Sequence, residues 1–204
     1  MAGIGVRLNK IFGKNTLTTN MIGFFYSTLV TVAPMFAIII NLVLMEYFLK
    51  FSTLGYAQRE LFSCTILYTF IFSLLTASPF NAVLSRYISD VIYEERYQDI
   101  LPCYHIGMVL NIALSCLVGI PFCLWEHFIG GVSVAYVFAG FWCYSSLVLV
   151  FYSMIYLSIC KDYKKISFFF AMGMTVTVLL SFLLVKVFYW SITYGMLFSL
   201  TIGF

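Results

Sequence analysis

Charged residues are scarce in this chain. Asp, Glu, Lys and Arg make up 9% of its 204 residues, whereas an ordinary soluble domain has about 25%. Hydrophobic residues make up 63%, more than a soluble domain of this size can bury, because small domains have a high ratio of surface to volume. A bilayer removes this difficulty by solvating an apolar outer surface. The composition therefore excludes an ordinary soluble domain and predicts an all-α integral membrane protein.

The patterns that carry catalysis or bind metals are also missing from the sequence. It has no Gly-rich phosphate loop, no H-E-x-x-H and no G-x-S-x-G, and its two histidines, His105 and His127, are far apart. None of the six cysteines forms a C-x-x-C pair, and most lie in apolar runs, where cysteine packs as a small hydrophobe. We therefore expect no enzyme activity, no catalytic residues, no metal site and no cofactor. The net charge of +3 is not gathered in one patch, so we expect no nucleic-acid partner.

Five apolar runs are long enough to cross a bilayer, which takes about 20 helical residues. They cover residues 21–49, 61–89, 103–125, 132–159 and 167–190. A sixth run begins near Tyr194 and reaches Phe204 after about eleven residues, too few to span. We expect a transmembrane bundle over 17–204 with five complete helices and one partial helix. We favour the interpretation that this chain is the N-terminal half of a longer protein, truncated in helix six. The alternative is that the last residues form a tail that lies in the membrane interface.

Basic residues predict the orientation of the bundle. Residues 1–16 carry a short basic amphipathic pattern, which we expect to form a helix on the cytoplasmic leaflet. Eight Lys and Arg residues flank the spans on the side of this segment, and three flank them on the other side. By the positive-inside rule, the N-terminus is cytoplasmic. We expect a multi-pass protein of the bacterial inner membrane.

Four polar residues within the spans are candidates for a substrate path: Asn41, Asn81, Ser85 and Asn111. The three amides are the stronger candidates, because an amide is costly to bury without partners. The alternative is that such residues only join packed helices, since Ser, Thr and Asn often hydrogen-bond between membrane helices.

Arg86 and Asp90 lie near the end of the second span with i, i+4 spacing, so the two side chains are able to pair. We consider them as a cytoplasmic gate or a docking site. A salt bridge that only fixes the helix end explains them equally well.

Two segments resemble one known family. The start, MAGIGVRLNKIF, is similar to the opening of the PelG family of Pel exopolysaccharide transporters. Residues 72–102 resemble that family's second helix and the loop that follows it. The matching positions are Pro79, Phe80, Val83, Leu84, Ser85, Arg86, Tyr87, Ile88, Ser89, Asp90, Ile92 and Tyr93. The first helix departs from the family pattern, because Ala33–Pro34 stands where the family has Gly-Pro.

The resemblance implies a fold and a function. Family members are similar to MATE/Wzx flippase-like transporters, which have two six-helix halves, and this chain would correspond to the first half. The implied activity is export of a Pel-like exopolysaccharide, a cationic amino-sugar polymer, during production of the biofilm matrix. The implied partners are a cytoplasmic glycosyltransferase, other membrane subunits, and either the missing second half or further copies of this chain.

Two other functions stay open at this point. One is an antiporter or flippase of the same superfamily that moves small molecules or lipid-linked oligosaccharides. The other is a membrane scaffold that does not transport but holds a polysaccharide synthase complex together.

Overall fold

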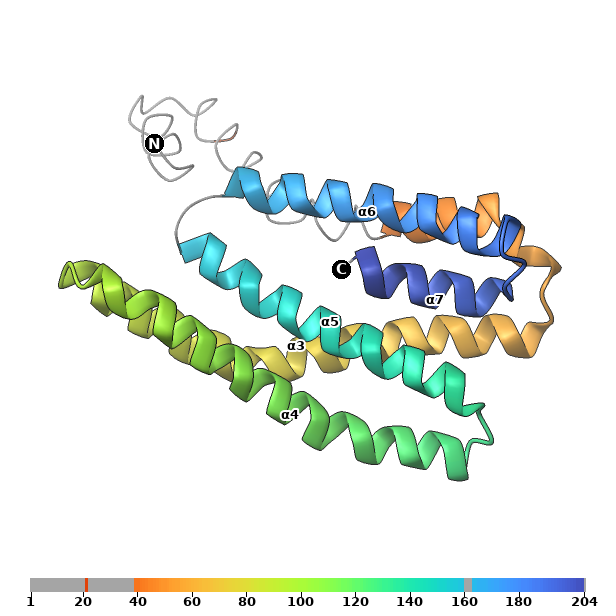
Figure 1. Cartoon of the computed structure of the whole chain (residues 1–204), viewed down its shortest axis with the longest axis horizontal. Helices are drawn as coiled ribbons and strands as arrows, with labels where there is room; N and C mark the ends of the chain where they lie inside the picture. The colour runs from red at the N-terminus through yellow and green to blue at the C-terminus, as the bar shows by residue number, and fades with distance from the viewer. Residues whose placement is uncertain (1–20, 22–38, 160–162, 204) are drawn as a thin grey trace.

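The computed structural model describes Met21, residues 39–159 and residues 163–203, and every regular element in these residues is helical (Figure 1). Of the first predicted span, the structure describes Met21 and the part from Ile39 onward, in which Ile39–Phe48 forms a helix. The predicted amphipathic segment 1–16 lies outside the described residues. The helices that follow are η1 (Phe51–Thr53), α3 (Tyr56–Tyr93), η2 (Tyr97–Asp99), α4 (Ile100–Phe128), α5 (Val134–Ile159), α6 (Tyr163–Lys186) and α7 (Ile192–Gly203).

The all-α membrane bundle is confirmed. Four helical stretches in the described residues are long and apolar enough to cross a membrane: Tyr56–Tyr93, Tyr97–Phe128, Val134–Met154 and Phe168–Lys186. They contain the cores of the second to fifth predicted spans, while Ile39–Phe48 and α7 are shorter apolar helices. The connections between consecutive long helices are short, so each helix begins beside the end of the one before it. Consecutive long helices therefore run in opposite directions (Figure 1).

The turn between α4 and α5 shows how local sequence ends these long helices. Gly130 and Gly131 follow the last turn of α4, and Gly131 has a φ of 65°. This left-handed conformation is readily adopted by glycine, which has no Cβ to clash with the backbone. The chain therefore reverses direction here and begins α5 at Val134.

Helix α5 lies at the centre of the described bundle, where it contacts α3, α4, α6 and α7 (Figure 1). Helix α7 lies between α6 and α5, and most of its side chains are buried: Thr193, Met196, Leu197, Ser199, Leu200 and Thr201. The main apolar core joins α7 to α3, α5 and the Ile39–Phe48 helix through residues such as Met45, Phe62, Leu147 and Met196.

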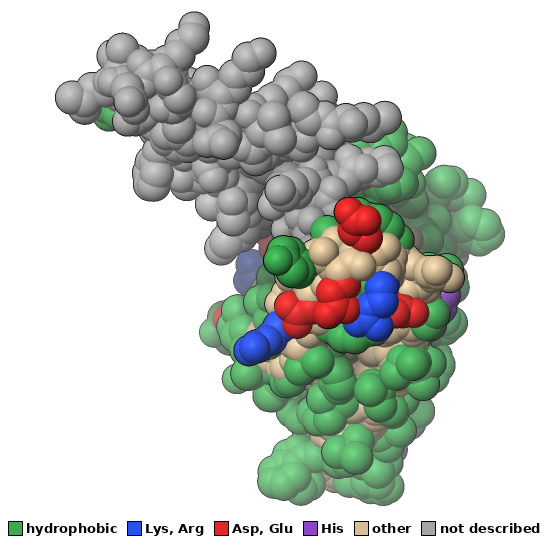
Figure 2. Space-filling model, turned by 90° about the vertical axis from the view of Figure 1, so that its left-hand side faces the viewer, with side chains coloured by type: hydrophobic (Ala, Val, Ile, Leu, Met, Phe, Trp, Pro, Cys, Tyr) green, Lys and Arg blue, Asp and Glu red, His purple; other side chains and the backbone are tan. Residues whose placement is uncertain are grey.

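The α3–α4 hairpin is longer than its neighbours and extends past the ends of α5 and α6 (Figure 1). With 38 residues, α3 is about 57 Å long at 1.5 Å per residue, whereas the hydrocarbon core of a bilayer is about 30 Å thick. Acidic and basic side chains gather at the tip of this hairpin (Figure 2). The tip therefore lies outside the hydrocarbon.

Candidate functional site

Asn41 is buried between the Ile39–Phe48 helix and α6. Its side chain is 2% exposed, and its Nδ2 atom donates a hydrogen bond to Met174 Sδ at 2.7 Å. Its Oδ1 atom is buried and has no hydrogen-bond partner among the described residues. One polar atom of Asn41 therefore remains available as an acceptor inside the bundle.

Asn111 lies in the contact between α4 and α5. It is fully buried, and its Nδ2 atom donates to the Gly107 carbonyl oxygen, one turn earlier, at 3.0 Å. On the same face of α4, Gly107 and Gly119 lie against the rings of Tyr152 and Tyr144 of α5. The Oδ1 atom of Asn111 is buried and also lacks a partner among the described residues.

Asn81 and Ser85 lie one turn apart on α3, and both are half-buried. Ser85 Oγ donates to the Ala82 carbonyl oxygen at 2.9 Å, so its hydroxyl is satisfied within its own helix. Asn81 Oδ1 is buried and unpartnered within the described part of the chain. Three of the four predicted path residues, the asparagines, therefore each have a buried amide oxygen without a hydrogen-bond partner among the described residues. Asn41 and Asn111 nevertheless lie in different helix contacts.

Arg86 and Asp90 are exposed near the C-terminal end of α3, and they form no ion pair with each other. The ion pairs found among the described residues join Arg96, in the turn of the hairpin, to Glu94 and Asp99. Arg96 Nε donates to Glu94 Oε2 at 2.7 Å, and this carboxylate raises the pKa of the Arg96 guanidinium. The structure therefore does not contain the ion pair that the spacing of Arg86 and Asp90 permits, and both residues are exposed.

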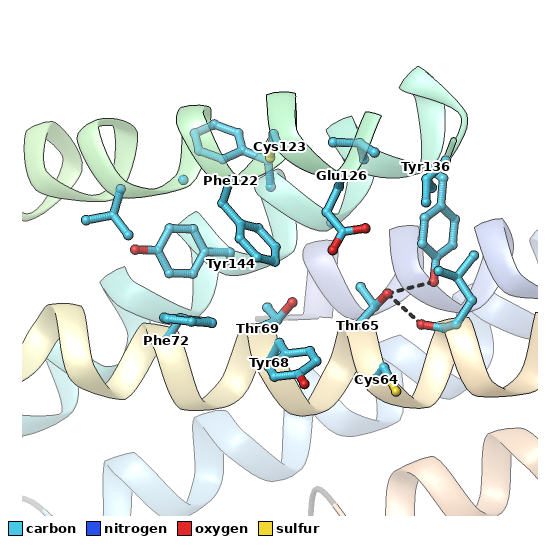
Figure 3. A pocket seen from close by; sticks show the side chains of 17 residues that line it. Cys64, Thr65, Tyr68, Thr69, Phe72, Phe122, Cys123, Glu126, Tyr136 and Tyr144 are labelled. Atoms are coloured by element: carbon cyan, nitrogen blue, oxygen red, sulfur yellow. Dashed lines mark hydrogen bonds between the residues drawn. The ribbon is translucent and has the colours of Figure 1, made fainter. Parts of the chain in front are cut away.

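A cavity of about 170 Å³ lies between α3, α4 and α5, at the end of the bundle where α4 turns into α5 (Figure 3). Figure 1 shows α4 diverging from α3 toward this end. All three helices contribute aromatic rings to its walls: Tyr68, Phe72, Phe122, Tyr136, Phe141 and Tyr144. None of the four predicted path residues lines this cavity.

The few polar groups of the cavity are hydroxyls and one carboxylate. Tyr136 Oη donates to Thr65 Oγ1 at 3.2 Å, and Thr65 Oγ1 donates to the Leu61 carbonyl oxygen at 2.7 Å. Tyr144 Oη is hydrogen-bonded to Thr76 Oγ1 at 2.7 Å. The Glu126 carboxylate points into the cavity toward α3 (Figure 3) and forms no ion pair among the described residues.

Sequence reasoning missed this cavity and its carboxylate, although a signal was present. Glu126 is the one charged residue between Asp99 and Lys161. A lone ionisable residue in or next to a membrane span indicates function by default. The topology argument counts only Lys and Arg around the spans, and such a count leaves this carboxylate out.

A second cavity, of about 390 Å³, lies between α5 and α6 near Gly203. Its lining includes Ser146, Ser153 and Phe169 and none of the predicted path residues. In the described part of the chain, no group of three or more His, Cys, Asp or Glu side chains is placed to hold a metal ion.

These features define the class of the protein. Long apolar helices form a bundle with exposed hydrophobic side chains outside and buried Asn, Ser and Thr side chains inside. A bundle of this kind is a multi-pass α-helical membrane protein.

The comparison with family models gives the particular family. The model described as "PelG: Putative exopolysaccharide Exporter (EPS-E)" matches residues 1–204. The chain belongs to the PelG family. No curated protein matches it, and no solved structure does.

Proposed function

We propose that this protein is a component of an inner-membrane exporter that moves an exopolysaccharide out of the cell, with a Pel-like polymer as substrate and the biofilm matrix as destination. Two observations support the proposal. The family match spans residues 1–204, and the described helices suit a membrane-embedded path. The proposed role is passage of the polymer without catalysis.

The observation that supports a polymer path through these helices is the set of unpartnered amide oxygens. Oδ1 of Asn41, Asn81 and Asn111 is buried at each position with no hydrogen-bond partner among the described residues. Leaving a polar atom buried and unsatisfied costs about 1–3 kcal/mol, so three such atoms need an explanation. A saccharide carries many hydroxyl donors, and these would satisfy the amides as the polymer passes. Ser85, one turn beyond Asn81, would extend the same path toward the α3–α4 turn.

Asn41 and Asn111 are almost fully buried, so the path we propose is closed in this conformation. It would open by separation of α4 from α5 and of the Ile39–Phe48 helix from α6. Transporters built from repeats hold their substrate between two halves. We therefore propose that these helices face either a second half or a second copy of the chain when the path is open.

We further propose that Arg86 and Asp90 act as a cytoplasmic gate or as a docking site for a partner such as a glycosyltransferase or another membrane subunit. Both side chains are exposed near the tip of the α3–α4 hairpin, which is longer than a bilayer requires. Their charges are therefore free to bind a partner in water.

Reporter fusions test the orientation on which this assignment depends. We expect alkaline phosphatase to be active when fused after Gly131, in the α4–α5 turn, and inactive when fused after Glu95, in the α3–α4 turn. Green fluorescent protein fused at the same two points should show the reverse pattern. Phosphatase activity at Glu95 with fluorescence at Gly131 would place the N-terminus outside and contradict the proposed orientation.

Deletion of the gene in its native host tests the export function itself. Polymer outside the cell should fall to background, while nucleotide-sugar-dependent polymer synthesis persists inside or in isolated membranes. Re-expression of the full protein should restore export. Normal amounts of extracellular polymer in the deletion strain would refute the proposal, and loss of both synthesis and export would favour the scaffold alternative.

A further inference from the structure

We propose that the cavity between α3, α4 and α5 binds a phospholipid whose headgroup carries a primary ammonium, as in phosphatidylethanolamine. In this arrangement Glu126 pairs with the ammonium, and part of one acyl chain lies between the aromatic walls. The inference does not depend on the export function proposed above.

The first argument is the isolation of Glu126. It is the one charged residue between Asp99 and Lys161, it is half-buried, and it points into the cavity (Figure 3). A partly buried charge with no counter-ion is unfavourable, because it loses hydration without gaining a partner. No Lys or Arg side chain in the described residues compensates it. A cation supplied by a ligand would do so.

The second argument is the depth of Glu126 in the membrane. It lies two residues before the end of α4 at Phe128, where the span leaves the hydrocarbon. Headgroup amines of phospholipids lie at this level, whereas the acyl chains lie deeper. The carboxylate is therefore at the right depth to meet a headgroup.

The third argument is the order of polar and apolar groups along the cavity. On α3 the lining runs from Leu61 to Phe72, about 17 Å at the helical rise. Glu126 and the hydroxyls of Thr65 and Tyr136 lie toward the α4–α5 end, while Phe72 and Tyr144 lie at the far end (Figure 3). A phospholipid has the same order, with its charged head at the interface and its chain in the interior.

The fourth argument is access from the bilayer. Several lining residues are exposed on the outer surface of the bundle, including Leu61, Tyr68 and Phe122 at 36%, 51% and 44%. The cavity is therefore open toward the lipid. Its volume of about 170 Å³ is close to that of a cavity of about 150 Å³ that holds one benzene. It accommodates a segment of one acyl chain, and the rest of the lipid would lie on the outer surface, against the exposed lining residues.

The chemistry of the carboxylate selects the headgroup. A primary ammonium donates hydrogen bonds to a carboxylate and pairs with its charge. A choline headgroup has no N–H to donate. A glycerol headgroup brings only the negative phosphate, which the carboxylate repels. We therefore expect preference for ethanolamine over choline, and for choline over glycerol.

Lipid retention tests the proposal. The full protein is purified after incubation in equal amounts of ethanolamine, choline and glycerol phospholipids with identical acyl chains, and the retained lipids are counted by native mass spectrometry. We expect about one retained ethanolamine lipid per chain, enriched roughly three- to fivefold over the glycerol lipid, as a partly exposed ion pair would give. Glu126→Gln preserves the shape and should abolish this preference.

Two further variants make the test specific. Glu46→Gln removes the same charge from an exposed residue that does not line the cavity, so the preference should persist. Gly140→Leu places a side chain in the cavity, because a Cβ at Gly140 meets only Thr65 Cγ2 at 3.6 Å, and retention of the bound lipid should be lost.

Three results would overturn the proposal. They are equal retention of all headgroups by the wild-type protein, an unchanged preference in Glu126→Gln, and displacement of the retained lipid by soluble glucosamine. The last result would identify a soluble amine, rather than a lipid, as the occupant.

Discussion

Replacing Asn111 with Leu should abolish most polymer export while leaving the bundle at least as stable as the wild type. Asn111 is fully buried and its Oδ1 atom has no partner among the described residues, so this oxygen costs the closed bundle about 1–3 kcal/mol, which the hydrogen bond from Nδ2 to the Gly107 carbonyl oxygen offsets only in part. Leu has a similar shape and removes the unsatisfied oxygen. We expect the unfolding temperature in detergent to stay constant or rise by a few degrees. Extracellular polymer should fall at least about tenfold, which corresponds to ~1.4 kcal/mol of lost stabilisation along the path.

Ser115 supplies a matched control for this substitution. It lies one turn from Asn111 on the same buried face of α4, and its hydroxyl donates to the Ile112 carbonyl oxygen at 2.8 Å. Because its hydrogen bond is satisfied within the helix, Ser115→Ala should leave export near the wild-type level. Wild-type export by a stabilised Asn111→Leu protein would show that Asn111 only packs the helices, and the proposed path would lose its most buried member.

Replacing Gly107 with Ala should destabilise the contact between α4 and α5. A Cβ at this position would overlap the hydroxyl of Tyr152. Tyr152 is fully buried, stacks on Tyr104 with ring centroids 5.3 Å apart, and donates to the Tyr104 carbonyl oxygen at 3.1 Å. Overpacking of this kind costs about 1–3 kcal/mol. For a chain of this size we expect the unfolding temperature to fall by about 5 °C.

Two variants separate this collision from the general effect of adding a methyl group to a helix. Gly140→Ala adds the same group where its nearest neighbour, Thr65 Cγ2, would be 3.6 Å away, so stability should be unchanged or slightly higher. Adding Tyr152→Phe to Gly107→Ala removes the hydroxyl that collides and should recover part of the lost stability. An unfolding temperature equal to the wild type in Gly107→Ala alone would show that Tyr152 moves aside without loss.

Much of the fold could be predicted from hydropathy alone, because the bilayer requires long apolar helices. The ends of the predicted spans agree less well with the ends of the helices in the structure. The second predicted span began at residue 61, whereas α3 begins at Tyr56 and continues to Tyr93. Hydropathy detects where apolar side chains end, but the backbone hydrogen bonds of a helix continue through polar and charged residues. The extension of the α3–α4 hairpin beyond the hydrocarbon was missed for this reason.

The candidate site was harder to predict, because it depends on how the helices lean against each other. The sequence places Asn81 and Ser85 in one predicted span, but it could not show that Asn41 contacts α6 while Asn111 lies in the contact between α4 and α5. The i, i+4 spacing of Arg86 and Asp90 permits an ion pair that the structure does not form, since exposed pairs gain little free energy. The cavity at Glu126 arises where α4 diverges from α3, and sequence periodicity contains no information about that divergence.

Photo-crosslinking from Asn81 tests most directly whether the polymer passes through this bundle. A benzophenone amino acid is introduced at Asn81, half-buried on α3, or at Val83, which is 71% exposed on the same helix. Cells that synthesise the polymer are irradiated, and the purified protein is probed for attached saccharide. We predict saccharide on the Asn81 variant and none on the Val83 variant. Saccharide on neither variant during active export, or only on the Val83 variant, would contradict a path through these helices.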